Sequence, residues 1–153
     1  MLVGVISDTH GLLRPQALDA LRDSDCIVHA GDIGSLEILD GLSRIAPVYA
    51  IRGNNDRAQW ASHLPETRLL DLDGIPLYVI HDVNDLGRQP PASAARVVVS
   101  GHSHAPKARE EAGVLYLNPG SAGRRRFRLP VCVAHLRITH HNVHAKLLEL
   151  DVP

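Results

Sequence analysis

The sequence predicts an α/β fold, an αββα sandwich of two mixed β-sheets flanked by helices. In the first half of the chain, short β-rich runs alternate with helical stretches, which is typical of parallel strands joined by crossover helices. In the second half, two strand-like runs flank Asp73-Gly74, a dipeptide that favours tight hairpin turns, so antiparallel pairing is expected there. The chain of 153 residues has the length of one domain, which we expect to span residues 1–153.

The first half contains three predicted strands and two predicted helices. In chain order these are strand 2–6, helix 15–22, strand 26–30, helix 36–45 and strand 48–51. The first helix has apolar side chains at helical spacing and Pro15 in its first turn, where the fixed φ of proline is suitable. Ser35 precedes the second helix and is its expected N-cap.

The second half is predicted to be rich in strands. They are residues 68–72, 76–81, 97–100, 114–117, an alternating run from 131 to 138, and 143–150. His140-His141-Asn142 is the expected turn between the last two strands, and Gln89-Pro90-Pro91 is expected to be a loop within the domain.

Composition argues against several classes of protein. The 16 basic and 17 acidic residues nearly cancel, so stable binding of nucleic acid through bulk electrostatics is not expected. A strand directly follows Met1 and no apolar stretch approaches membrane-spanning length, which argues against export and membrane anchoring. Cys26 and Cys132 lie inside strand-like runs and are expected to be buried, reduced thiols, which favours a cytoplasmic location.

Seven side chains that commonly bind metals follow predicted strands. They are Asp8, His10, Asp32, Asn54, His81, His102 and His104. Because ligands bind beyond the carboxyl ends of the strands in open α/β sheets, these side chains should converge on one crevice. A mixed nitrogen and oxygen set without thiolate suits Mn, Fe, Zn, Ni or Co in a catalytic site. Seven donors exceed the needs of one ion, so we predict a two-metal centre that shares Asp32, which follows Gly31 at a sharp turn.

Five short motifs that contain these residues follow one another along the chain. They are Asp8-Thr9-His10, Gly31-Asp32, Gly53-Asn54-Asn55-Asp56, His81 and Gly101-His102-Ser103-His104. One such motif alone is weak, because a single aspartate or histidine after a strand is usually a turn residue. The ordered series resembles the calcineurin-like metallophosphoesterases, and the short length with Asn118-Pro119-Gly120-Ser121 is similar to their small prokaryotic phosphodiesterase branch.

The resemblance implies a phosphodiesterase with two divalent cations, Mn by expectation and Zn, Ni, Fe or Co as alternatives. It assigns Asp8, His10, Asp32 and His104 to one ion, and Asp32, Asn54, His81 and His102 to the other. A bridging hydroxide would attack phosphorus, and the expected catalytic residues are Asp32, Asn54, His81 and Asp56. The expected partner is a small phosphodiester or nucleotide-like substrate, and homo-oligomerisation stays open.

Three alternatives to a phosphodiesterase remain at this point. The first is a phosphomonoesterase of the same fold. The second is a non-catalytic protein-binding scaffold, since a eukaryotic trafficking subunit has a similar fold, although every expected metal ligand is present here. The third is a cyclic-nucleotide enzyme, for which Trp60 is the only tryptophan available to stack on a base.

Further residues of the motifs are expected to support the site. Asp56 is expected to hydrogen-bond the neighbouring Asn54 amide or a ligand imidazole, or else to be a turn residue. Asn55, Asn118 and Arg124 are the expected substrate-binding residues. Arg124 opens the run Arg-Arg-Arg-Phe-Arg at residues 124–128, and the alternative for this run is a solvated edge loop.

Two positions depart from the family pattern. Asn55 stands where the family has histidine or cysteine, and an amide cannot protonate a leaving group. Asp82 follows His81 where the family usually has glycine. Six histidines lie outside the motifs: His29, His63, His135, His140, His141 and His144. The last four lie in the C-terminal run of strands and are expected to be solvated or locally hydrogen-bonded.

Overall fold

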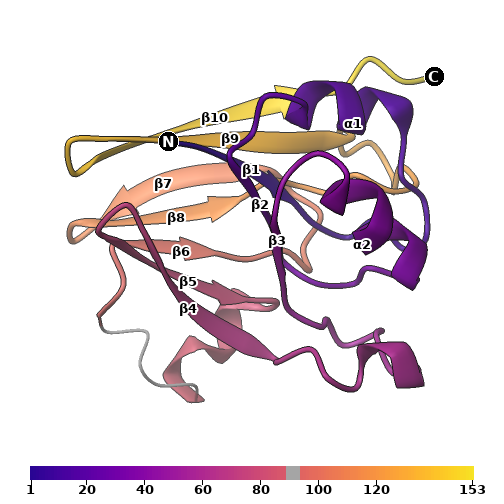
Figure 1. Ribbon diagram of the computed structural model, residues 1–153, viewed down its shortest axis with the longest axis horizontal. Helices are drawn as coiled ribbons and strands as arrows, with labels where there is room; N and C mark the ends of the chain where they lie inside the picture. The colour runs from indigo at the N-terminus through magenta and orange to yellow at the C-terminus, as the bar shows by residue number, and fades with distance from the viewer. Residues whose placement is uncertain (89–93) are drawn as a thin grey trace.

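The structure is a computed structural model, which describes residues 1–88 and 94–153 (Figure 1). Its strands are β1 (Leu2–Ile6), β2 (Cys26–His29), β3 (Val48–Ala50), β4 (Thr67–Leu72), β5 (Ile75–Ile80), β6 (Val97–Val99), β7 (Lys107–Glu111), β8 (Val114–Asn118), β9 (Cys132–Thr139) and β10 (Asn142–Glu149). Its helices are α1 (Pro15–Leu21) and α2 (Leu36–Ser43), with the 3-10 helices η1 (Gln59–Ala61) and η2 (Val83–Arg88). The predicted loop at Gln89-Pro90-Pro91 lies outside the described residues.

The strands form two five-stranded sheets that pack face to face. The strand order is β10-β9-β1-β2-β3 in the first sheet and β4-β5-β6-β8-β7 in the second. Both sheets mix parallel and antiparallel pairs: β1 pairs with β2 in parallel and with β9 in antiparallel fashion, and β5 pairs likewise with β6 and β4. The predicted sandwich of two mixed sheets is therefore confirmed.

Helices α1 and α2 cover the outer face of the first sheet (Figure 1). Leu21 of α1 and Leu42 of α2 are buried in one cluster with Ile6 and Ile27, which point outward from β1 and β2. Pro15 starts α1 as predicted. Ser35 occupies the N-cap position of α2, but its side chain makes no capping hydrogen bond, so that part of the prediction was wrong.

On the second sheet, η2 takes the place of an outer helix. Leu86 of η2 packs against Tyr78 and Ile80 of β5. None of the helices within the described residues is long and apolar enough to span a membrane.

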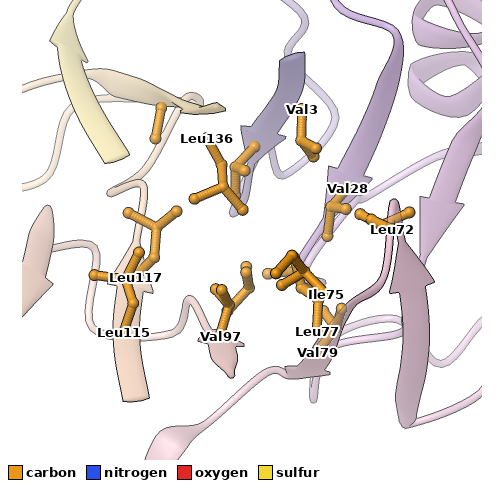
Figure 2. Close-up of a cluster of buried hydrophobic side chains, with 14 of the residues drawn as sticks. Val3, Val28, Leu72, Ile75, Leu77, Val79, Val97, Leu115, Leu117 and Leu136 are labelled. Atoms are coloured by element: carbon orange, nitrogen blue, oxygen red, sulfur yellow. The ribbon is translucent and has the colours of Figure 1, made fainter. Parts of the chain in front are cut away.

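The main hydrophobic core lies between the two sheets (Figure 2). Val3 and Val28 of the first sheet face Leu77 and Val97 of the second, and all four side chains have no exposed surface. These residues alternate along their strands with residues that face the other way, because successive strand side chains point to opposite faces. Burial of this apolar surface holds the two sheets, and the loops at their edges, in a fixed relation.

Both predicted hairpin turns are confirmed. Asp73 and Gly74 have φ values of 56° and 84°, and His140 and His141 have φ values of 48° and 68°. Positive φ at both central residues matches the right-handed twist of the flanking strands.

The two cysteines are free and buried as predicted, and burial raises the pKa of Cys132 to about 11, so this thiol stays protonated. Strand β7 was not predicted, because all five of its side chains are exposed and it has no apolar alternation.

Candidate metal centre

The predicted ligands follow the carboxyl ends of five strands. Asp8 and His10 follow β1, Asp32 follows β2, Asn54 follows β3, His81 follows β5, and His102 with His104 follows β6. Backbone hydrogen bonds connect these loops across the sandwich: the Asp8 N–H donates to the Gly31 carbonyl at 3.0 Å, and the Gly101 N–H donates to the His81 carbonyl at 2.9 Å. The two sheets therefore contribute to one site.

Five of the seven predicted ligands have a left-handed backbone. The φ values are 54° for Asp8, 45° for His10, 56° for Asp32, 70° for His102 and 64° for His104. Residues other than glycine seldom adopt this conformation, and such strained residues concentrate at functional sites. The predicted sharp turn at Gly31 is also present, with φ of 99°, and a Cβ there would lie 2.8 Å from the His81 Nδ1 atom.

Asp8 is at the centre of the assembled side chains. Its Oδ1 atom lies 3.3 Å from His104 Nε2, 3.7 Å from His10 Nε2 and 3.9 Å from His81 Nε2. The Asp32 Oδ2 atom lies 3.2 Å from His81 Nε2 and 3.7 Å from His10 Nε2. Two compact sets result whose possible ligand atoms all lie within 4.8 Å of one another, namely Asp8 with His10 and His104, and Asp8 with Asp32 and His81.

The division of the ligands between two ions differs in part from the expectation. Asp8 belongs to both compact sets, whereas the sequence pattern gave Asp32 the shared role. His102 belongs to neither set, and its Nε2 atom lies 3.7 Å from Asp82 Oδ2. Asn54 is exposed and lines the cavity beside His81. The shared role of Asp32 and the ligand roles of Asn54 and His102 stay predictions.

Several buried atoms at the centre have no hydrogen-bond partner. Four of the five such side-chain atoms in the described residues are here: Asp8 Oδ1, His10 Nε2, His81 Nε2 and His104 Nδ1. Buried polar atoms are almost always paired, because leaving them unpaired costs free energy. An imidazole and carboxylate set of this kind fits a divalent cation.

Both buried carboxyl groups are ionised at neutral pH. Burial alone raises the pKa of Asp8, but the imidazoles of His10 and His104 and the Ser7 hydroxyl outweigh it and hold this pKa well below its usual range. Burial likewise raises the pKa of Asp32, and the His81 imidazole and the Asn55 N–H reverse the effect and lower it. Two negative charges are therefore available for cations.

His81 is oriented by the backbone. Its Nδ1 atom donates to the Ala30 carbonyl at 2.7 Å, so Nε2 faces the carboxylates. Burial lowers the pKa of His81, but the Asp32 carboxylate and the Ala30 carbonyl outweigh it and raise the pKa to about 9. Without a metal ion the ring holds a proton on Nε2 at neutral pH, and a bound cation would replace that proton.

Asp56 supports the site in a way that the sequence did not predict. Its carboxylate accepts hydrogen bonds from the N–H groups of Ile33 (3.1 Å), Gly34 (3.1 Å) and Gly53 (2.8 Å). None of its described hydrogen bonds reaches Asn54 or a ligand imidazole, whereas the Asp56 N–H donates to the Gly53 carbonyl at 3.1 Å, which fits the alternative of a turn residue. Asp56 holds together the loops that follow β2 and β3.

His29 was set aside by the sequence but connects two ligand loops. It is fully buried, and its Nδ1 atom accepts the Gly31 N–H at 3.1 Å. Nε2 therefore carries the proton and donates to Thr9 Oγ1 at 3.0 Å, while the Thr9 hydroxyl donates to the Ile33 carbonyl at 2.8 Å. Burial lowers the pKa of His29 to about 4, so the ring is neutral. Its place directly before Ala30-Gly31-Asp32, at the end of an apolar run, was the available indication.

Two of the predicted substrate-binding residues, Asn55 and Asn118, bind ligand-bearing loops, and their contact with substrate stays a prediction. The Asn55 backbone N–H and its Nδ2 atom donate to the two Asp32 carboxylate oxygens, each at 3.0 Å. Asn118 is buried, and its amide donates to the Gly101 carbonyl at 2.9 Å and to Ser103 Oγ at 3.1 Å. Both side chains are therefore committed to ligand-bearing loops. Arg124 is exposed and lines neither of the two cavities described next, so its substrate-binding role stays a prediction.

A cavity of about 340 Å³ opens beside the metal-binding residues. It is lined by Arg52, Gly53, Asn54, Glu66, Thr67, Ile80, His81, Asp82, Asp85 and His102. A second cavity of about 310 Å³ shares Arg52, Gly53, Asn54 and Glu66 with it. Arg52 lines both, and its Nη2 atom lies 3.3 Å from Glu66 Oε1. The sequence analysis missed Arg52, although it lies two residues before the predicted ligand Asn54.

Comparison with known proteins identifies the family of the chain. The family model of the calcineurin-like phosphoesterase superfamily domain matches residues 1–141. The chain is 37% identical to a probable metallophosphoesterase of Methanothermobacter thermautotrophicus, over 100% of this chain and 95% of that protein. It is 27% identical to a phosphodiesterase of Methanocaldococcus jannaschii, over 78% of this chain and 83% of that protein. Among solved structures, Vps29 of Chaetomium thermophilum shares the fold, with a TM-score of 0.78, 16% identity and coverage of 100% of this chain and 98% of that one. The chain belongs to the calcineurin-like phosphoesterase superfamily, as the order of its motifs predicted.

Proposed function

We propose that this chain hydrolyses phosphodiester bonds with two bound divalent cations, with Mn²⁺ as the first candidate and Zn²⁺, Ni²⁺, Fe²⁺ or Co²⁺ as alternatives. The observation that carries the proposal is the group of buried, unpartnered atoms around Asp8. These atoms belong to carboxylate and imidazole groups on loops of both sheets, so a ligand bound among them must accept lone pairs from several directions, with the Nε2 proton of His81 displaced on binding. A divalent cation does so.

The residues of the chain prepare the site for phosphoryl chemistry. When bound, the cations polarise the phosphoryl group and make water a better nucleophile near neutral pH. Ionised Asp8 and Asp32 supply the negative charge that retains the cations. The Ala30 carbonyl keeps His81 Nε2 directed at the carboxylates, and Asn55 keeps both oxygens of Asp32 in place.

The cavity beside His81 supports a diester substrate. A diester carries two alcohol groups and one negative charge, so it needs room for the second alcohol. The cavity gives that room, and Glu66, Asp82 and Asp85 in its wall disfavour the doubly charged phosphate of a monoester. The activity named for the Methanocaldococcus jannaschii relative points the same way.

Asn55 bears on which diesters are cleaved fastest. Its side chain donates to Asp32, and an amide has no proton to give to a leaving alkoxide. Substrates whose leaving alcohol is acidic should therefore react faster than those with a simple alcohol.

The test compares two chromogenic substrates on the metal-stripped protein after each divalent ion is added back. We expect turnover of bis(p-nitrophenyl) phosphate with Mn²⁺, and a higher kcat/KM than for p-nitrophenyl phosphate. A preference for the monoester would favour the phosphomonoesterase alternative. No turnover with any ion would favour a non-catalytic scaffold.

A second test addresses the number of ions. Asp32→Ala should abolish turnover and reduce the bound metal, measured by elemental analysis, from two ions per chain. The matched control is Asp40→Ala, an exposed carboxylate on α2. Two retained ions in the Asp32 variant would contradict the shared role of this carboxylate.

A further inference from the structure

Residues 124–128 form an exposed loop, here called the basic loop, with the sequence Arg-Arg-Arg-Phe-Arg. All five side chains are exposed, and Phe127 is 92% exposed, whereas no other large hydrophobic residue in the described chain exceeds the 45% of Leu69. A bridge between Ser121 and Val131 closes the base of the loop. Packing does not explain why an aromatic ring is exposed to solvent among four arginine side chains.

The backbone conformation at the tip of the basic loop is unfavourable for a residue as bulky as Phe127. The Leu129 N–H donates to the Arg126 carbonyl at 3.1 Å, which makes a turn with Phe127 as its first central residue. Phe127 has φ of 52°, a conformation in which glycine is the favourable residue and a bulky side chain is strained. A strained residue that buries no surface is an indication of a binding role.

The arginines of the basic loop carry uncompensated charge. Some exposed arginines elsewhere have carboxylate partners, such as Arg22 with Asp19 at 3.3 Å and Arg109 with Glu111 at 3.8 Å, and those without one, such as Arg44 and Arg137, are isolated in the sequence from other arginines. Within residues 1–88 and 94–153, none of the four loop arginines has such an ion pair. Because the net charge of the chain is only -1, this loop is a local concentration of positive charge and not part of a generally basic surface.

The basic loop is attached directly to the metal-binding turn. The Gly123 N–H and the Ser121 hydroxyl both donate to the Asp8 carbonyl, at 3.2 and 3.0 Å. Arg14 Nε also donates to the Gly123 carbonyl at 3.2 Å, which adds a guanidinium at the base of the loop. A polyanion held by the loop would therefore lie next to the turn that carries Asp8 and His10.

We propose that the basic loop binds single-stranded nucleic acid and that oligonucleotides are a substrate class of this enzyme, the second part resting on the proposed function. Guanidinium groups pair with phosphates in a planar, bidentate manner, and an exposed aromatic ring stacks on a base of any identity. In the reaction a water oxygen bonds to phosphorus, the bond from phosphorus to the leaving oxygen breaks, and that oxygen takes up a proton. The products are a shorter strand with a terminal phosphate and one with a terminal hydroxyl.

An anionic membrane is the competing partner, and the surface fits it less well. Four arginines alone attract an anionic membrane by only about 1 kcal/mol each, and stable insertion into its surface needs a larger apolar face that enters the lipid. The other exposed large hydrophobic residues in the described chain are on separate elements, namely Met1 before β1, Leu36 in α2, Leu69 in β4 and Val83 in η2. A single ring among arginines suits one base better than a bilayer.

The binding test uses the full chain and a fluorescein-labelled oligothymidylate of about twelve nucleotides, with fluorescence anisotropy in EDTA and then with Mn²⁺. For Arg125→Ala/Arg126→Ala/Arg128→Ala we expect at least about tenfold weaker binding, and a salt dependence of the affinity reduced by about two in log–log slope. The control Arg22→Ala/Arg109→Ala removes two exposed arginines elsewhere and should change the affinity less than about twofold. Equal affinities of the wild-type protein and the loop variant would overturn the proposal.

Phe127 gives an independent readout. Phe127→Gly relieves the left-handed strain, so its Tm should be equal to or higher than that of the wild type, while oligonucleotide binding weakens about tenfold at an unchanged salt slope. Weaker binding in a fold that is no less stable supports stacking. Unchanged binding shows that the ring has no role and overturns that part of the proposal.

Activity measurements separate this proposal from the proposed function. The arginine loop variant should keep wild-type turnover of bis(p-nitrophenyl) phosphate and lose turnover of the oligonucleotide. Loop-dependent binding without hydrolysis of either substrate would refute the proposed function and leave the binding surface supported. Loop-dependent retention on phosphatidylglycerol vesicles without oligonucleotide binding would identify a membrane as the partner and overturn the proposal.

Discussion

His29 connects the first two ligand loops through neutral hydrogen bonds, at a position with no exposed surface. The ring accepts from the backbone next to Asp32 and donates to Thr9, the residue between the ligands Asp8 and His10. Outer residues that orient metal ligands commonly change metal affinity by about 10- to 100-fold when they are replaced. His29 is therefore expected to act on the metal centre without touching an ion.

Replacement His29→Leu tests this role. The variant fills a similar volume but leaves the Gly31 N–H and the Thr9 hydroxyl without this partner, at a cost of roughly 2 to 4 kcal/mol in the free energy of unfolding. We expect a lower urea midpoint and at least about tenfold weaker Mn²⁺ binding by calorimetry. His144→Leu, which alters an exposed histidine on β10, is the control and should change neither. Unaltered metal affinity in His29→Leu would show that the ring has only a packing role.

Two histidines with displaced pKa values give the metal-free protein an optimum of stability. The folded pKa of His29 is about 4, below its ordinary 6.5, so the unfolded chain binds more protons and stability falls as the pH drops from about 6.5 toward 4. The folded pKa of His81 is about 9, so its contribution is complete below pH 6.5 and is lost as the pH rises through 9. Urea midpoints in EDTA should therefore be lower at both about pH 4.5 and about pH 9.5 than near neutrality. The His29→Leu variant should lose less stability on the acid side, and an acid side identical to that of the wild type would contradict the assignment.

At the scale of elements, Asp56 joins the loop after β2 to the loop after β3. Its three backbone hydrogen bonds hold the positions of Asp32 and Asn54 relative to each other. The segments involved are more than twenty residues apart in sequence, with Ile33 separated from Asp56 by 23 positions. One carboxylate thus fixes the spacing of two ligand-bearing loops.

Replacement Asp56→Ala removes the acceptor oxygens of all three hydrogen bonds. The loss of stability should be about 3 to 5 kcal/mol, because each unpaired buried N–H costs roughly 1 to 3 kcal/mol and the loops relax in part. Metal binding should weaken as well, since both loops lose their fixed spacing. Denaturant unfolding and calorimetry with Mn²⁺ measure the two effects, and Asp40→Ala is the exposed control on α2. Equal stability of the two variants would refute the structural role of Asp56.

The sequence predicted elements with a hydrophobic pattern and missed contacts that depend on the assembled fold. Apolar runs such as those of β1 and β5 are visible locally, and Asp73-Gly74 specifies its own turn. Strand β7 is charged and exposed, so only its pairing with β8 makes it a strand. The ligands could be found because strand ends determine where they meet. The hydrogen bonds of Asp56 could not be predicted, because a carboxylate that binds distant N–H groups resembles any turn aspartate in sequence. The position of Arg52 in the cavity wall could not be predicted either, because it depends on the assembled loops.

At the scale of the whole molecule, the candidate metal centre draws its residues from both sheets. Asp8, His10 and Asp32 come from the first sheet, while His81 and His104 come from the second. A cation bound among them is a contact between layers that only the folded state offers. Its binding free energy therefore adds to the stability of the fold.

Removal of the metal should lower the thermal midpoint of the protein. A ligand at 100 times its Kd stabilises the folded state by about 2.7 kcal/mol, and for a chain of this size each kcal/mol corresponds to roughly 2 to 4 °C. We expect Tm to fall by about 5 to 10 °C when Mn²⁺ is replaced by EDTA, measured by differential scanning fluorimetry. Asp32→Ala should show a smaller shift under the same exchange. A wild-type Tm that does not respond to any divalent ion would show that the two layers are not connected through a metal.

The position of β9 between β10 and β1 has a consequence for biosynthesis. Strand β1 completes its pairing only with residues 132–139, and the Asp8 carbonyl accepts from residues 121 and 123. While a ribosome makes this chain at roughly 5 to 20 residues per second, the first ligand turn waits on the order of ten seconds for those segments to emerge. Cation uptake by the candidate site would thus be a late, largely post-translational event, and nascent chains that stall before β9 should leave the ribosome without metal.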